Sequence, residues 1–283
     1  MKADLHLHTT ASDGRLSPRD IVSLAVKVGL DIIAITDHDT IDGIEPALSA
    51  AEAFSSLTVI PGIEINTDVP DGEVHILGYF IDYSDRKLAA SLQILRNSRQ
   101  ERAQKMLAKL SDLGMEIDWQ RVCELAQGGS VCRPHIAHAL FEKGYVGSEK
   151  EAFDKYIGHG GPAHVERYKL LPADAVKLVI DAHGLPVLAH PADIPDLNEL
   201  VSELKAVGLV GIETYYRDYS ADIVAGLSKI AKQYDLIPTG GTDYHAFGDD
   251  SEVMMGGAMA PEESVKRLFA LADRRSLELM KQG

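Results

Sequence analysis

Short apolar segments rich in valine, isoleucine and leucine alternate with amphipathic stretches along most of this chain. Such alternation is typical of buried strands joined by crossover helices in a mainly parallel sheet. The segments with the length and composition of strands are residues 3–8, 31–36, 58–65, 74–80, 186–190, 210–214 and 236–239. The pattern therefore predicts an α/β fold. The chain has 283 residues, which suits either one barrel or a barrel with an insertion.

One region interrupts the alternation. Residues 82–169 contain consecutive amphipathic stretches and no convincing strand. We expect a long charged helix that ends near residue 113, followed by helices near 118–127, 133–143 and 148–157. The sequence thus predicts a barrel built from residues 1–81 and 170–283, with residues 82–169 inserted as an all-helical domain.

Histidines and carboxylates recur where the predicted strands end. They are His6, His8, Asp13, His38, Glu64, His75, His190, Asp243 and His245. His6 and His8 lie two residues apart on one strand, so both side chains face the same side of the sheet. Barrels of this class build their sites at the C-terminal ends of the strands, where the loops converge. We therefore expect these side chains to form one site.

The chemistry of this set points to metal ions. Imidazole and carboxylate ligands without cysteine suit zinc, iron or manganese. A tetrahedral zinc ion uses about four ligands, which is fewer than the candidates available here. The sequence therefore predicts a centre with more than one divalent ion, in which Glu64 is the bridging carboxylate.

The charge balance restricts the partners: 28 basic and 43 acidic side chains give a formal charge of −15. Proteins that bind long nucleic acids or anionic membranes through their general field are normally basic. Cys123 and Cys132 form no CxxC pair and suit a reducing compartment, and the first residues lack a signal peptide's apolar core. We expect a cytoplasmic monomer or small homo-oligomer that binds neither duplex nucleic acid nor membrane.

Several motifs resemble one family. They are Asp4-Leu5-His6-Leu7-His8, Ser12-Asp13-Gly14, Ile35-Thr36-Asp37-His38-Asp39-Thr40, Pro61-Gly62-Ile63-Glu64, Ala189-His190-Pro191 and Gly241-Thr242-Asp243-Tyr244-His245. With them the chain resembles the polymerase and histidinol phosphatase (PHP) family of metal-dependent phosphoesterases. The resemblance implies a distorted (βα)7 barrel that holds up to three divalent ions.

The resemblance also implies how the ligands are shared among the ions. His6, His8, Glu64 and Asp243 would hold one ion. Asp13 and His38 would hold a second and share Glu64, and His75, His190 and His245 would hold a third. We expect Asp37 and Asp39 to orient His38.

The inserted region resembles one branch of this family, through Ser130-Val131-Cys132-Arg133-Pro134-His135-Ile136-Ala137 and Pro162-Ala163-His164-Val165. That branch acts on nucleoside 3′,5′-bisphosphates and on the 5′ ends of short RNAs. The resemblance implies that Arg133 binds phosphate, for which its planar donors are suited, and that His135 assists. His164 stands where Tyr is expected, and the charged run from Arg96 to Arg102 is interpreted as an exposed helix face.

The leading hypothesis is hydrolysis of a phosphate ester of a nucleotide or short single-stranded RNA by a hydroxide held between metal ions. Arg133 would stabilise the transition state, and His190 or His245 would protonate the leaving group. A metal-dependent amidohydrolase or phosphotriesterase is an alternative, although no predicted strand ends in the lysine that such barrels usually carry. A non-catalytic metal-stabilised module is another, and it would be expected to lack ligands.

Overall fold

The computed structural model describes residues 1–69, 72–126, 129, 131–166, 170–248 and 252–280. One sheet contains all seven predicted strands in sequential order. They are β1 (Ala3–Leu7), β2 (Ile32–Ile35), β3 (Thr58–Val69), β4 (Gly72–Tyr79), β5 (Leu185–Leu188), β6 (Gly211–Tyr216) and β7 (Ile237–Gly241). Neighbouring strands are parallel except for β4, which is antiparallel to both β3 and β5. The α/β fold predicted from the sequence is confirmed.

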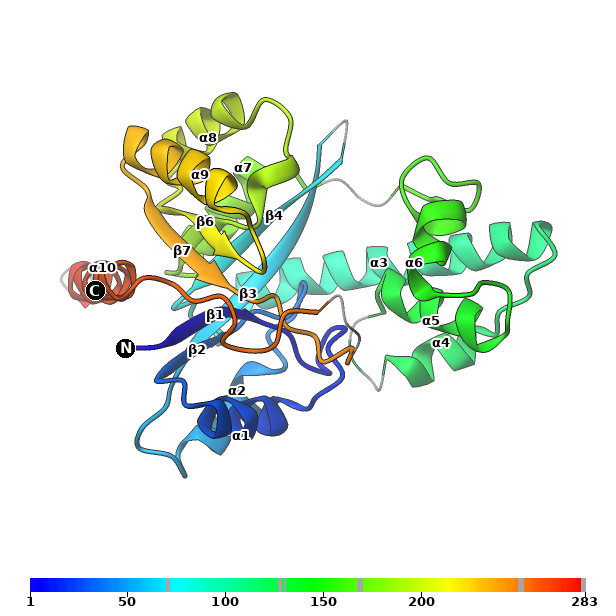
Figure 1. The fold of residues 1–283 in the computed structure, drawn as a ribbon, viewed down its shortest axis with the longest axis horizontal. Coiled ribbons are helices and arrows are strands. Elements are labelled where there is room, and N and C mark those ends of the chain that lie inside the picture. The colour runs from blue at the N-terminus through cyan, green and yellow to red at the C-terminus, as the bar shows by residue number, and fades with distance from the viewer. Residues whose placement is uncertain (70–71, 127–128, 130, 167–169, 249–251, 281–283) are drawn as a thin grey trace.

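The sheet curls until its first and last strands meet (Figure 1). A parallel bridge between Leu7 and Tyr244 joins the ends of β1 and β7. Helices pack around this nearly closed barrel, namely α1 (Pro18–Val28), α2 (Ile44–Ala51), α7 (Pro172–Asp181), α8 (Leu197–Ala206), α9 (Ala221–Gln233) and α10 (Glu262–Met280). A short 3-10 turn, η2 (Pro191–Asp193), follows β5.

Local sequence explains where the first of these helices begins and ends. The Ser17 side chain accepts a hydrogen bond from the Asp20 amide, which satisfies one free N–H of the first turn of α1. Pro18 is preorganised for the first helical position. Gly29 ends the helix at φ 77°, a left-handed conformation that glycine adopts without steric cost. The chain is thereby returned to the start of β2.

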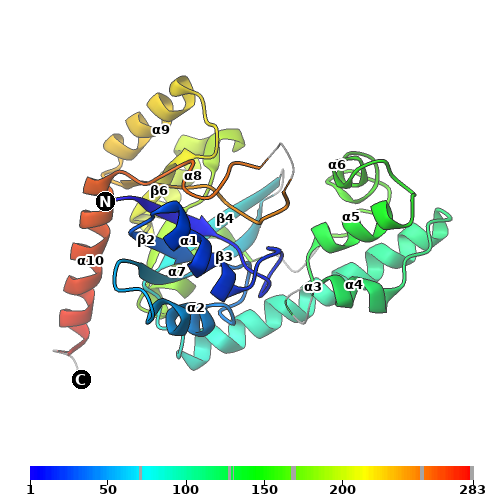
Figure 2. The same cartoon turned by 60° about the horizontal axis from the view of Figure 1, so that its bottom comes forward.

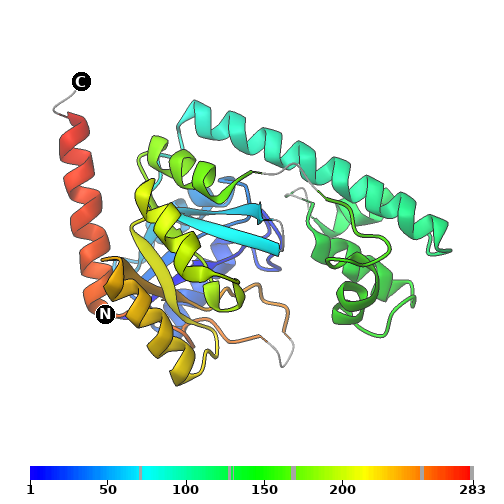
Figure 3. The same cartoon turned by 90° about the horizontal axis from the view of Figure 1, so that it is seen from above.

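The segment between β4 and α7 is helical and projects to one side of the barrel (Figures 1 and 2). It contains α3 (Arg86–Asp112), α4 (Trp119–Leu125), α5 (Arg133–Glu142), α6 (Glu149–Ala152) and the π-turn η1 (Phe153–Ile157). Seen from above, α3 runs from the barrel out to the other helices (Figure 3).

Two separate apolar cores flank α3. Leu88 and Leu92 in its first half pack into the barrel core, whereas Met106 and Leu110 in its second half pack with the helices that follow. One continuous helix therefore joins the two cores. The exact division of the chain at residues 82 and 169 remains a prediction, and residue 169 lies outside the described residues. Among the described helices, none has the length and apolar character needed to cross a membrane.

Candidate metal centre

The barrel collects the predicted ligands at one end. His6 lies in β1, and His8 and Asp13 follow that strand. Glu64 and His75 lie in the antiparallel pair β3 and β4. His38, His190, Asp243 and His245 follow β2, β5 and β7. Because loops after parallel strands converge at one end of a barrel, side chains far apart in the sequence meet there.

Glu64 lies at the centre of this cluster and is completely buried. One of its oxygens, Oε2, lies 3.2 Å from His6 Nε2, 3.2 Å from His8 Nε2 and 3.0 Å from His38 Nδ1. The other, Oε1, lies 2.8 Å from His75 Nδ1 and 3.1 Å from His190 Nε2. Each oxygen thus faces a different set of imidazoles, which is the arrangement that a bridging carboxylate requires.

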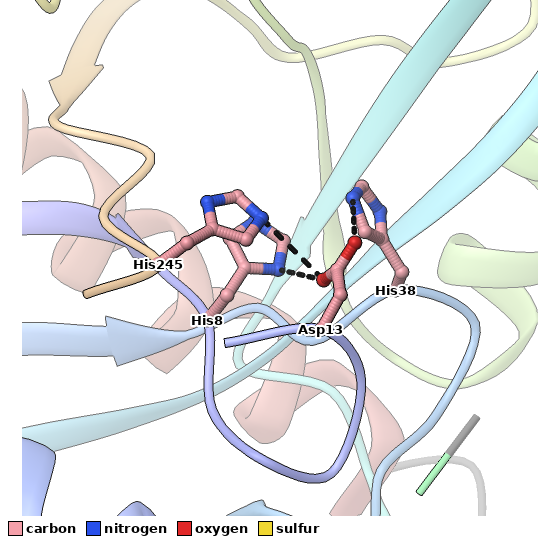
Figure 4. Close-up of side chains that lie close together, drawn as sticks. All are labelled: His8, Asp13, His38 and His245. Atoms are coloured by element: carbon pink, nitrogen blue, oxygen red, sulfur yellow. Dashed lines mark ion pairs between the residues drawn. The ribbon is translucent and has the colours of Figure 1, made fainter. Parts of the chain in front are cut away.

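Three overlapping groups place their ligand atoms within 4.8 Å of one another. They are His6, His8, Glu64 and Asp243; His8, Asp13, His38 and His245; and His38, Glu64 and His75. The second group is shown in Figure 4, where His8, His38 and His245 surround the Asp13 carboxylate.

The position of His245 differs from the expected grouping. Its ring stacks on that of His8 at 4.1 Å and 11°, and its Nε2 lies 3.4 Å from Asp13 Oδ1. The family resemblance implies instead that it shares an ion with His75 and His190. The loop after β7 runs beside the loop after β1, because β7 and β1 are the strands that close the barrel. This closure decides which ligands His245 joins.

Several buried polar atoms of the cluster have no hydrogen-bond partner in the described structure. They are His6 Nε2, both ring nitrogens of His8, Asp13 Oδ1, His38 Nδ1 and Glu64 Oε2. A buried polar atom without a partner costs about 1–3 kcal/mol, so native proteins rarely leave several together. All these atoms belong to ligand types that bind divalent transition metals. The residues present therefore fit such ions.

The charges of the cluster support the same reading. Burial alone would raise the pKa of Glu64, but the surrounding imidazoles, above all His38, hold it well below its usual range. Burial alone would lower the pKa of His8, yet its contacts with Asp243 and Glu64 raise that pKa to about 10. The pKa values of Asp13 and Asp243 are also lowered well below their usual range by neighbouring imidazoles, so these carboxylates are ionised at neutral pH. Metal ions would replace the imidazole protons as their counter-charge.

Backbone conformations at two ligands are uncommon. His190 has φ 23° and Asp243 has φ 51°, in the region that non-glycine residues rarely adopt. Such conformations cost about 1–3 kcal/mol and persist where the surrounding structure imposes them, often at functional sites. At both positions the chain turns directly after a strand, which directs the side chain into the cluster.

Glu213 in β6 was missed by sequence reasoning. It is completely buried, and its Oε1 lies 3.1 Å from His6 Nδ1 while its Oε2 accepts the His190 amide at 2.8 Å. It therefore contacts two predicted ligand residues, His6 through its ring and His190 through its backbone. Its only sequence signal is an acidic residue within a strand that otherwise reads as apolar.

Asp37 and Asp39 make contacts of their own beside the cluster, and a role in orienting His38 stays a prediction. Asp37 accepts hydrogen bonds from Thr9 and Ser12 and so shapes the loop after β1. Asp39 accepts the Asn66 amide and the Arg99 guanidinium at 2.6 Å. Both carboxylates therefore help to fix the loops and the helix that border the cluster.

A cavity beside the cluster is lined by arginines from the helical segment. Its walls include the ligand candidates Asp13, His38 and His75 and the side chains of Arg99, Arg102 and Arg133. The prediction that residues 96–102 form an exposed helix face is wrong for Arg99 and Arg102, which are each only 8% exposed, although Gln100 and Glu101 are exposed. Arg99 and Arg102 are spaced i, i+3, so the sequence already places them on one face of the helix.

The two predicted substrate contacts occupy different positions. Arg133 borders the cavity and donates to Glu73 Oε2 at 2.5 Å. His135 is buried, and its Nδ1 accepts the Cys132 amide at 3.0 Å, so it caps the first turn of α5. Its other edge borders a second cavity, lined also by Arg15, His138 and Phe247. A substrate role for either residue stays a prediction.

The chain is similar to known proteins over most of its length. A model of the PHP domain matches residues 4–144. A 5′-3′ exoribonuclease from Haemophilus influenzae is 34% identical over 86% of this chain and 90% of its own. A 3′,5′-nucleoside bisphosphate phosphatase from Chromobacterium violaceum is 31% identical over 87% of this chain and 88% of its own. The crystal structure of a proposed metal-dependent phosphoesterase from Bifidobacterium adolescentis has a TM-score of 0.87, with 29% identity and 95% coverage of both chains.

Proposed function

Since this chain belongs to the PHP family and is a metal-dependent hydrolase of phosphate esters, we propose that its substrates are nucleoside 3′,5′-bisphosphates or short single-stranded RNAs. Of the relatives named above, one is a 5′-3′ exoribonuclease and another is a 3′,5′-nucleoside bisphosphate phosphatase. Both proposed substrate classes present a terminal phosphoryl group next to a ribose. The acidic surface, with a formal charge of −15, disfavours long duplexes.

The observation that carries this proposal is the contact between the ligand cluster and the arginine cavity. Asp13, His38 and His75 belong to both. A phosphoryl group at this boundary would meet metal ions on one side and guanidinium groups on the other. Arginine binds phosphate oxygens through paired, charge-assisted hydrogen bonds, so the cavity suits a phosphate ester better than an amide.

The proposed roles follow from position and exposure. Two or three ions of manganese, zinc or iron would be held by the nine predicted ligands, and when bound they would neutralise phosphate charge and acidify water. Arg133 would hold the non-bridging oxygens. In a centre that leaves one of these histidines free of metal, His190, with a side chain 24% exposed, is better placed than the more buried His245 to give a proton to the leaving alkoxide. We also propose that the protein acts in the cytoplasm.

The test is phosphate release from a substrate panel by protein loaded with each metal in turn. The panel contains a nucleoside 3′,5′-bisphosphate, the two matching monophosphates, a 5′-phosphorylated RNA trimer and a duplex RNA. We expect the bisphosphate or the trimer to be preferred and the duplex to be resistant. No release from any substrate with any metal would contradict the proposal.

A pair of variants then tests the phosphate contact. Arg133→Ala should lower kcat/KM by about 10- to 100-fold, as expected for loss of a charge-assisted hydrogen bond of about 1.5–3 kcal/mol. Arg121→Ala is the matched control, since Arg121 lies in the same helical segment but pairs with Glu124 and Glu142 away from the cavity. Equal effects of both variants would remove Arg133 from the substrate site.

A further inference from the structure

Ion pairs connect the helical segment to the barrel around the candidate site. Asp39 pairs with Arg99, Glu73 with Arg133, and Arg15 with Glu149. The apolar core of α4, α5 and α6 is separate from the barrel cores. The position of these helices next to the ligand cluster therefore depends more on individual ion pairs than on apolar packing shared with the barrel.

Glu73 makes the contact nearest to the ligands. It lies in β4, two residues before His75, and its Oε2 is 3.9 Å from His75 Nε2. The same oxygen accepts Arg133 Nη2 at 2.5 Å, and its Oε1 lies 3.8 Å from Arg102 Nη2. A carboxylate of the barrel thus holds guanidinium groups of the helical segment next to a predicted metal ligand.

This contact leaves most of the Arg133 guanidinium available. Only Nη2 of Arg133 donates a hydrogen bond within the described part of the chain, so its Nε and Nη1 remain for another acceptor. The guanidinium carbon lies 5.7 Å from the centre of the Phe153 ring, which supports one face of the group. Glu73 and Phe153 together therefore define the orientation of Arg133 at the cavity wall.

Electrostatics explains why a carboxylate is needed there. The positively charged side chains of Arg99, Arg102 and Arg133 line one cavity, so they repel one another. Asp39 offsets the charge of Arg99, and Glu73 offsets those of Arg102 and Arg133. Without the Glu73 charge, Arg133 would gain by turning away from its neighbours toward water, since its side chain is already 22% exposed.

We propose that Glu73 is a positioning residue that directs Arg133 toward the metal cluster, so that the barrel itself sets the affinity for the substrate phosphoryl group. The proposal rests on the proposed function, because it requires Arg133 to bind that group. Glu73 acts through Arg133 and does not touch the substrate.

The test uses Glu73→Gln, which keeps the shape of the side chain and removes its charge. Binding of inorganic phosphate to the metal-loaded protein is measured by calorimetry, and kcat and KM are measured on the best substrate. We expect the Kd for phosphate and the KM to rise by roughly three- to tenfold, with kcat within about twofold. Glu73→Asp should recover part of the affinity. Glu142→Gln, which breaks the Glu142–Arg121 pair away from the cavity, should change neither constant.

A double variant separates positioning from a general effect of charge. In the Arg133→Ala background, Glu73→Gln should weaken phosphate binding no further, because the residue through which it acts is gone. Unchanged or tighter phosphate binding in Glu73→Gln, or an equal weakening in both backgrounds, would overturn the proposal. If no substrate is hydrolysed, the proposed function fails, while the phosphate titrations still decide the role of Glu73.

Discussion

Replacing Glu213 with glutamine should weaken metal binding although this residue is not a predicted ligand. Glu213 Oε1 lies 3.1 Å from His6 Nδ1, and the opposite nitrogen of that ring, Nε2, faces Glu64 and Asp243 at 3.2 and 3.4 Å. A carboxylate behind Nδ1 holds the proton there and leaves Nε2 free to bind metal. Its second oxygen accepts the His190 amide.

Glutamine has one acceptor oxygen, whereas Glu213 accepts hydrogen bonds from both His6 Nδ1 and the His190 amide. If the glutamine oxygen accepts from the His190 amide, its NH2 group faces His6 Nδ1. That contact favours the tautomer with the proton on Nε2, where the metal should bind. If the oxygen accepts from His6 instead, the NH2 group of the glutamine faces the backbone N–H of His190, and two donors then oppose each other. Either outcome costs about 1–3 kcal/mol, and comparable losses behind metal-binding histidines lower affinity about 10- to 100-fold.

The assay is competition between the protein and a chromogenic chelator for zinc or manganese. Glu203→Gln serves as the control, since Glu203 lies exposed on α8. Thermal melts of the metal-free proteins check that each variant is folded. A folded Glu213→Gln protein whose metal affinity stays within about twofold of the wild type would refute the reasoning.

Two further predictions concern protonation. Contacts of the buried rings of His8 and His75 with carboxylates raise their pKa values to about 10 and about 9, above 6.5 in the unfolded chain, so this stabilisation is complete below pH 6.5 and lost as the pH rises through 9 to 10. Denaturant titrations should therefore show that the free energy of unfolding of metal-free protein falls from pH 6.5 to 9. Over the same range, added metal should stabilise the protein by an increasing amount. The opposite trend would contradict this. Burial raises the pKa of the Cys132 thiol to about 12, so a thiol reagent at pH 8 should label Cys123 alone in native protein and both cysteines in denaturant; labelling of native Cys132 would disprove its protection.

Local patterns in the sequence predicted much of the fold. Strands such as β2 and β5 are short buried apolar segments, and their composition alone identifies them. The spacing of His6 and His8 places them on one strand face regardless of what lies opposite. The unbroken pattern of α3 likewise predicts a long helix. The spacing of Arg99 and Arg102 shows that they share a helix face but not that this face is buried, because burial depends on what packs against the helix.

The sequence by itself determined which residues could bind metal and at which end of the barrel they would gather, since both follow from residue type and strand order. Only the tertiary structure decided their partners. His245 joins Asp13 because β7 closes on β1, Glu213 backs His6 from a strand far along the chain, and Arg133 reaches the cluster through Glu73. Contacts of this kind depend on distances in space between segments remote in sequence, which no local periodicity encodes.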